Sequence, residues 1–135
     1  MFLLFFRYKK ITGLEKNPKK YIEKLFHFLD DKGFTKSHYQ VNGEECLIYK
    51  KEEFYIAINY DCNIKMQYVN FDIYYKTWDN DGVIKHLYIK DEQYKLRFHE
   101  YDNMNCKEKL DLVAEYLSQY VEDVMQANIN NSNKY

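Results

Sequence analysis

The chain has 135 residues, of which 46% are apolar and 30% are charged, with four glycines and one proline. This composition excludes a disordered chain and a fibrous repeat, and no apolar run reaches the ~20 residues that a membrane-spanning helix needs. The net charge of −1 excludes a global positive field that would attract nucleic acid or an anionic membrane. A chain of this length is typical of one domain that folds on its own hydrophobic core.

Cys46, Cys62 and Cys106 are odd in number and widely spaced. A secreted disulfide framework has an even and denser set, so we interpret these residues as free thiols in a reducing compartment. The sequence therefore predicts a cytoplasmic protein. Its excess of lysine, asparagine, isoleucine and tyrosine is typical of AT-rich codons and indicates a low-GC microbial or phage genome.

Residues 1–16 lack the basic segment and the cleavage site of a signal peptide, and we interpret them as either a first strand or an extension. Asn17 and Pro18 then predict a helix start. Asparagine can cap the first turn, and the N–H that proline lacks would have no partner within the helix at this position. Gly33 supplies the left-handed residue that ends a helix. The sequence predicts a helix over Pro18–Lys32, with an apolar stripe formed by Ile22, Leu25, Phe26 and Leu29.

From Ser37 onward the apolar residues alternate, which is typical of strands. Asn42-Gly43 suits a type I′ turn and predicts a hairpin. Within the third long segment the apolar positions change from even to odd, which predicts a bulge near residues 68–70. The expected strands form an antiparallel meander over residues 38–41, 44–50, 54–60, 64–76, 83–90 and 93–101.

Asn105 and Glu108 resemble a capping box and predict a longer C-terminal helix with a stripe that ends near Val124. Residues 128–135 show no periodicity, so we expect a disordered tail. The predicted fold is α+β: one domain over residues 1–127, in which a sheet of five to six antiparallel strands packs against an N-terminal and a C-terminal helix.

No motif for catalysis, a cofactor or a metal is present. The histidines and cysteines lack metal-ligand spacing, and the four glycines form no phosphate-binding loop. Residues 77–88 imitate a calcium loop but lack its first Asp and its final Glu, so a hairpin turn is the preferred interpretation. We expect a protein without cofactor, metal or nucleic-acid partner that is not an enzyme, although distant residues can still assemble a site in space.

Tyrosine is the most informative residue type, with 15 in the chain. A buried hydroxyl needs a hydrogen-bond partner, so we expect several tyrosines to point outward, where they are favoured at protein interfaces. Sheet propensity and genome bias are the competing explanation. The residues that we expect to bind a partner protein are Tyr55, Tyr88, Tyr101, Asp79 and Asp81.

The chain resembles the small bacterial immunity-type proteins, which inhibit toxins by binding them. The resemblance rests on the helix 18–32, the segments His38-Tyr-Gln-Val-Asn-Gly-Glu-Glu-Cys-Leu-Ile-Tyr49 and Phe54-Tyr-Ile-Ala-Ile-Asn-Tyr60, and the closing helix. It covers the whole domain in element order and composition and includes no diagnostic motif, so no site residue is transferred. It implies that acidic and aromatic surface residues contact the partner.

Two alternatives stay open. A sheet that packs against a long C-terminal helix also resembles the helix-grip, or START-type, architecture, in which a cavity holds a small apolar ligand. Against it, the sequence predicts one helix where that fold has two after the first strand. A secretion-chaperone-like homodimer that pairs through an edge strand is the other alternative.

Overall fold

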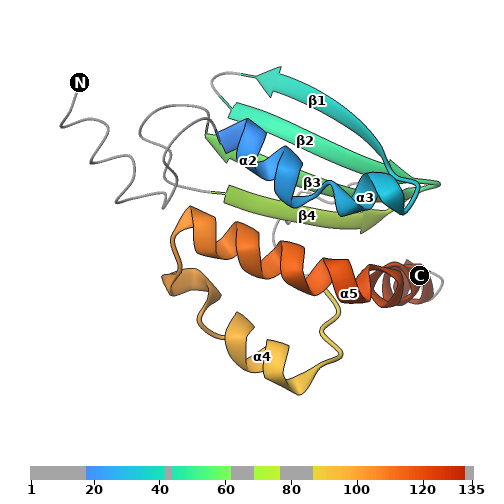
Figure 1. Cartoon of the computed structure of the whole chain (residues 1–135). Helices are drawn as coiled ribbons and strands as arrows, with labels where there is room; N and C mark the ends of the chain where they lie inside the picture. Colours follow the sequence, from blue (N-terminus) through green and yellow to red (C-terminus); the bar gives the residue numbers. More distant parts are fainter. Residues whose placement is uncertain (1–17, 42–43, 62–68, 77–86, 133–135) are drawn as a thin grey trace.

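The structure is a computed structural model that describes residues 18–41, 44–61, 69–76 and 87–132 (Figure 1). Along the chain, two short helices come first, four strands follow, and a short and a long helix come last. The elements in chain order are α2 (Pro18–Leu25), α3 (Phe28–Asp31), β1 (Thr35–Val41), β2 (Glu44–Lys51), β3 (Phe54–Asp61), β4 (Val69–Tyr75), α4 (Glu92–Phe98), the 3-10 turn η2 (Tyr101–Asn103) and α5 (Cys106–Ser132).

The strands form an antiparallel sheet in the order β1-β2-β3-β4, so the predicted α+β class, meander topology and C-terminal helix are confirmed. Tyr49 lies opposite Ile56, which lies opposite Ile73, and all three are buried. Because side chains alternate across a strand, these residues place the core on one face of the sheet. Helices α2, α3 and α5 lie on that face, and α4 lies on the side of α5 that is turned away from the sheet (Figure 1).

Aromatic side chains fill the core beneath α2. The fully buried ring of Phe26 lies 6.1 Å from the ring of Phe71 and 6.3 Å from the ring of Tyr49. From α5, Val113 and Leu117 are also fully buried in this core. Side chains from the helices and from the sheet thus belong to one hydrophobic core.

The segment predicted as one helix over Pro18–Lys32 is divided into α2 and α3. Leu29 N–H donates to Phe26 C=O and Asp30 N–H donates to His27 C=O, so the chain tightens into three-residue turns between the two helices. The predicted stop at Gly33 is confirmed by its φ of 91°. Phe34 N–H donates to Leu29 C=O and Gly33 N–H to Asp30 C=O, which is the Schellman pattern of a helix C-terminus.

The strand predicted over residues 93–101 is wrong, because this segment forms α4 and η2. The Asp91 carboxylate accepts a hydrogen bond from Gln93 N–H and starts the helix. Tyr94, Phe98 and Tyr101 follow helical spacing and pack inward, whereas Leu96, which the alternation placed beside them, is 70% exposed. The described part of the predicted strand 83–90 is also irregular, so the described sheet has four strands and not five to six.

The capping box that opens α5 is confirmed. Glu108 N–H donates to Asn105 Oδ1 at 2.8 Å, and Asn105 N–H donates to Glu108 Oε1 at 3.2 Å. The helix continues to Ser132 with a kink at Tyr120, past the start of the tail expected over residues 128–135. Asn128 lies buried in this part of the helix, and its side chain donates to Val124 C=O at 2.8 Å.

Several expectations lie wholly or mainly outside the described residues: the strand or extension over residues 1–16, the Asn42-Gly43 turn, the first part of the strand 64–76, the bulge near 68–70 and the hairpin turn within residues 77–88. From Val69 onward β4 pairs regularly with β3. In the described part of the chain, no helix combines the length and apolarity that crossing a membrane requires.

Candidate functional site

The face of the sheet opposite the core carries aromatic and aliphatic side chains. Tyr39 on β1 lies opposite Cys46 on β2, and Ile48 on β2 lies opposite Ala57 on β3. At the far end of the strands, Tyr55 on β3 lies opposite Tyr74 on β4. We call this surface the outer face; its described side chains are Thr35, Ser37, Tyr39, Glu44, Cys46, Ile48, Lys50, Tyr55, Ala57, Asn59, Asn70, Asp72 and Tyr74.

Among the apolar side chains of the outer face, Tyr39 on β1 is the most exposed, and Ala57 on β3 is fully buried. Tyr39 is 56% exposed, Ile48 and Tyr55 are half-buried, and Tyr74 is 9% exposed. The uncovered face of an antiparallel sheet is usually polar, since it meets water. The outer face therefore departs from that pattern in its aromatic content, and its accessible part lies over β1, β2 and Tyr55.

Tyr55 and Tyr74 form a stacked pair whose ring centroids are 4.6 Å apart, with an angle of 10° between the rings. Lys50 Nζ lies 5.3 Å from the centroid of the Tyr55 ring, within the range of a cation–π contact. Burial, and then the neighbouring Tyr55, raises the pKa of Tyr74 to about 12. The Tyr74 phenol is therefore neutral at physiological pH, and the stack presents a rigid aromatic surface.

Cys46 lies between Tyr39 and Asn59 on the outer face, and its thiol is neutral. Burial, followed by the nearby Asp72 and Glu44 carboxylates, raises its pKa to about 11. Since the thiolate is the nucleophile, this environment disfavours covalent catalysis by Cys46. On the adjacent strands, Asn59 Nδ2 donates to Asp72 Oδ2 at 2.9 Å, which fixes a polar pair within the aromatic face.

The sequence-predicted residues do not form one surface. Tyr55 lies on the outer face, whereas Tyr88 is 49% exposed beside α5, where its C=O accepts a 2.6 Å hydrogen bond from the Tyr116 hydroxyl. The expectation of an outward Tyr101 is wrong: it is 9% exposed, and burial raises the pKa of its hydroxyl. Asp79 and Asp81 lie outside the described residues.

Tyr39 is the most exposed aromatic residue of the outer face, and the sequence analysis did not include it among the expected partner-binding residues. A two-residue turn at Asn42-Gly43, which lie outside the described residues, predicts Val41 opposite Glu44, and β1 and β2 pair in this register, with Tyr39 opposite Cys46. This register follows from the turn alone and places Tyr39 on the face opposite Leu47, so a usable signal was present. No sequence feature indicated that Tyr74 stacks on Tyr55. The apolar positions of its strand change from even to odd, so the face on which Tyr74 lies was not predicted.

More tyrosines are buried than we expected from the need of each buried hydroxyl for a hydrogen-bond partner. The Tyr60 hydroxyl donates to Glu45 Oε2 at 2.6 Å, and the Tyr116 hydroxyl donates to Tyr88 C=O. Burial of these rings is therefore compatible with hydrogen bonding at the rim of the core. The buried tyrosines are Tyr49, Tyr60, Tyr74, Tyr94, Tyr101 and Tyr116.

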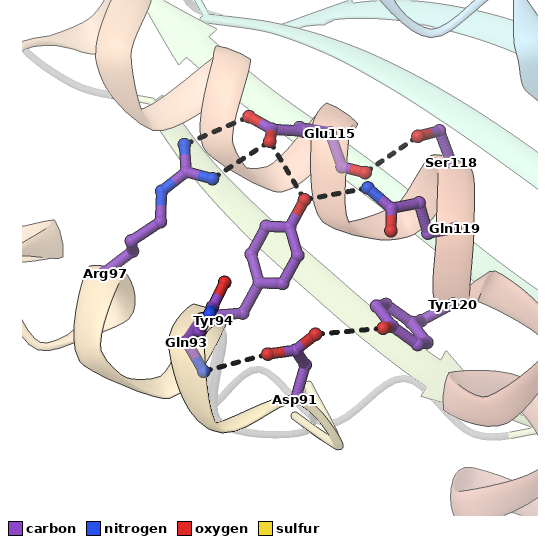
Figure 2. Close-up of polar contacts among 8 residues, drawn as sticks. All are labelled: Asp91, Gln93, Tyr94, Arg97, Glu115, Ser118, Gln119 and Tyr120. Atoms are coloured by element: carbon purple, nitrogen blue, oxygen red, sulfur yellow. Dashed lines mark hydrogen bonds and ion pairs between the residues drawn. The ribbon is translucent and has the colours of Figure 1, made fainter.

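A second polar cluster joins α4 to α5, as Figure 2 shows. Arg97 donates two hydrogen bonds to the Glu115 carboxylate, at 2.9 and 3.0 Å, and the Tyr94 hydroxyl donates to the same carboxylate at 2.9 Å. The Gln119 amide in turn donates to the Tyr94 hydroxyl oxygen. These contacts, Arg97 first, lower the pKa of Glu115.

The other end of this cluster is Asp91, whose carboxylate accepts from Gln93 N–H at 2.8 Å and from the Tyr120 hydroxyl at 3.0 Å (Figure 2). Both bonds lower the pKa of Asp91, the backbone bond first. Each polar side chain that joins the two helices is thus bonded to another group of the protein. We interpret the cluster as a set of contacts that holds α4 on α5, in contrast to the outer face, where the ring of Tyr39 is exposed and that of Tyr55 is half-buried.

Among the described residues, no three potential metal ligands lie together. Comparisons with protein-family models, curated proteins and solved structures found no match to the chain. The physical character of the outer face is therefore the basis for a functional proposal.

Proposed function

We propose that the protein is a non-enzymatic module that binds another protein through the outer face of its sheet. The observation that carries this proposal is the row of accessible aromatic and aliphatic side chains from Tyr39 to Ile48 and Tyr55 on the face opposite the core. Tyrosine provides a large, rigid and amphipathic contact area, and truncation of such an anchor typically costs ~2 kcal/mol or more of binding energy.

The charges on the outer face favour a protein over nucleic acid or a membrane. Lys50 and Glu44, which are both exposed, lie near opposite ends of β2 on this face, and Lys50 is beside Tyr55. A surface for phosphate groups is dominated by positive charge, whereas a protein surface offers both signs. We propose, on the resemblance in element order, that the partner is a bacterial toxin or effector that the module inhibits.

The contents of the core favour this proposal over a helix-grip ligand cavity. A ligand between helix and sheet would need the volume that the rings of Phe26, Tyr49 and Phe71 occupy in the described core. Pockets for small molecules of drug size enclose ~300 Å³ or more. Opening such a volume would displace several buried rings.

The test is calorimetry with a partner captured from the source organism. Tyr39→Ala and Tyr55→Ala should each weaken binding by about thirtyfold if each ring contributes ~2 kcal/mol. Tyr88→Ala is the matched control, because Tyr88 is comparably exposed but lies beside α5. Equal affinity of the two outer-face variants and the wild type, or a loss confined to Tyr88→Ala, would contradict the proposal.

A further inference from the structure

Strand β1 forms one edge of the sheet. Its seven residues pair with β2, and no described segment lies along its other edge (Figure 1). All of its residues from Thr35 to Gln40 are exposed. A regular edge strand without proline presents N–H and C=O groups that can pair with another strand.

The charged side chains that usually protect such an edge are engaged elsewhere. Lys36 forms an ion pair with Glu23 of α2, on the helix side of the sheet. His38 Nε2 lies 3.6 Å from Glu45 Oε1, and Glu45 also accepts a hydrogen bond from the buried Tyr60 hydroxyl. Isolated lysines on an edge discourage pairing with a second sheet, but here both basic groups of β1 have acidic partners within their own chain.

We propose that two copies of this chain form a two-fold homodimer by antiparallel pairing of β1 with β1, centred on His38. In this register all seven residues of each strand are paired. Centring the axis on Ser37 or on Tyr39 would leave some residues of each strand unpaired. Paired residues lie on the same face of a sheet. In the dimer, the odd-numbered residues of β1 therefore stay on the outer face and the even-numbered residues on the helix side.

The side chains of β1 are compatible with their own copies in this register. On the outer face, Ser37 lies opposite Tyr39 of the second copy, and the backbone of Thr35 pairs with that of Val41. On the helix side, Lys36 lies opposite Gln40, so the lysines do not face each other. His38 lies opposite its own copy on the axis, with Glu45 of each chain beside it.

The two-fold axis would stand perpendicular to the sheet, and the two outer faces would lie on the same side. The sheet would continue in the order β4-β3-β2-β1-β1-β2-β3-β4, with the Tyr39 residues of both copies near the axis. The pairing is isologous, as in most dimers of identical chains. It would place the most exposed tyrosine of the outer face at the centre of a doubled surface.

Disulfide trapping tests this register directly. Opposed residues in antiparallel strands have Cα atoms ~4.5–5.5 Å apart, within the range of a disulfide. His38→Cys should therefore form a cross-linked dimer under mild oxidation. Lys36→Cys is the matched control, because its two introduced thiols would lie on residues ~13 Å apart at ~3.3 Å per residue. The wild type under the same conditions measures the background from the native cysteines.

Sedimentation equilibrium of the wild-type chain provides a second test that needs no substitution. The proposal predicts a mass that rises with concentration toward twice the 16.6 kDa of one chain. It also predicts that His38→Cys cross-links several-fold faster than Lys36→Cys. A single-chain mass at all concentrations would overturn the dimer. Equal cross-linking by the two variants, or none above the wild-type background, would overturn the register.

Discussion

The rings of Tyr55 and Tyr74 lie 4.6 Å apart and almost parallel, on the face of the sheet that no described helix covers. The two residues come from adjacent strands and are directly opposed in the register of β3 and β4. Opposed aromatic residues on one face of a sheet stabilise the pairing by roughly 0.2–1 kcal/mol relative to alanine. The stack therefore contributes both to the sheet and to the surface proposed to bind a partner.

The high pKa of Tyr74 predicts a loss of stability at alkaline pH. Its folded-state pKa of about 12 lies above the value near 10 of an exposed phenol. The stabilising contribution is fully present below pH ~10 and decreases as the pH rises through ~10 to 12. In urea unfolding, the free energy of unfolding should fall less over this interval for Tyr74→Phe than for the wild type. An identical fall in both proteins would contradict a neutral, buried Tyr74 hydroxyl.

Asp91 predicts acid sensitivity of the contact between α4 and α5. Its pKa is lowered by hydrogen bonds from Gln93 N–H and Tyr120, so its stabilising contribution is present above the ordinary carboxylate pKa. That contribution decreases as the pH falls through the lowered pKa. Asp91→Ala should lower the thermal midpoint at pH 7 more than Asp91→Asn, which keeps the N-cap acceptor. Equal midpoints for the two variants would show that the cap does not stabilise α4.

Glu52 offers a stabilising substitution in the turn between β2 and β3. Its φ of 56° lies in the left-handed region, which costs an ordinary residue ~1 kcal/mol or more. Glu52→Gly should raise the free energy of unfolding by ~0.5–1 kcal/mol, measured by urea denaturation. Glu53→Gly is the control and should destabilise, because Glu53 is not among the positive-φ residues. A gain from Glu53→Gly and none from Glu52→Gly would refute this account of the turn.

Leu96 and Phe98 distinguish the helical structure of α4 from the strand that alternation suggests. Phe98 packs at 5.7 Å from the ring of Tyr116, whereas Leu96 is 70% exposed. Leu96→Ala should change the free energy of unfolding by no more than ~0.5 kcal/mol, as expected for a surface position. Phe98→Ala should be clearly destabilising in the same chemical denaturation experiment. Comparable losses for both variants would support a shared buried face and contradict α4.

The sequence correctly predicted those helix and strand ends that depend on one or two neighbouring residues. Asn105 and Glu108 form the reciprocal capping bonds that their spacing indicates, and Gly33 ends α3 because a left-handed residue is required there. The Asn42-Gly43 turn likewise predicts the hairpin of β1 and β2 that the structure contains. In each case the side chain or backbone freedom of nearby residues determines the structure.

Contacts between residues far apart in the chain determine the secondary structure that the sequence analysis predicted wrongly. Tyr94, Leu96 and Phe98 satisfy strand alternation, but Tyr94 and Phe98 also satisfy helical spacing, and their contacts with Tyr116 on α5 favour the helix. Tyr101, which the local pattern placed outside, is buried in the same core beside Phe98. The candidate surface was predicted only at Tyr55, because the stack with Tyr74 depends on a strand register set by the whole sheet.

The central claim, that the outer face binds a partner protein, is tested most directly by observing the tyrosine rings during binding. The chain, with isotope-labelled tyrosine rings, is titrated with the captured partner, and the ring signals are followed by nuclear magnetic resonance. Our account predicts changes at Tyr39 and Tyr55, with Tyr88 unaffected. Changes confined to Tyr88 and the α4 residues, with Tyr39 and Tyr55 unchanged at saturation, would contradict it.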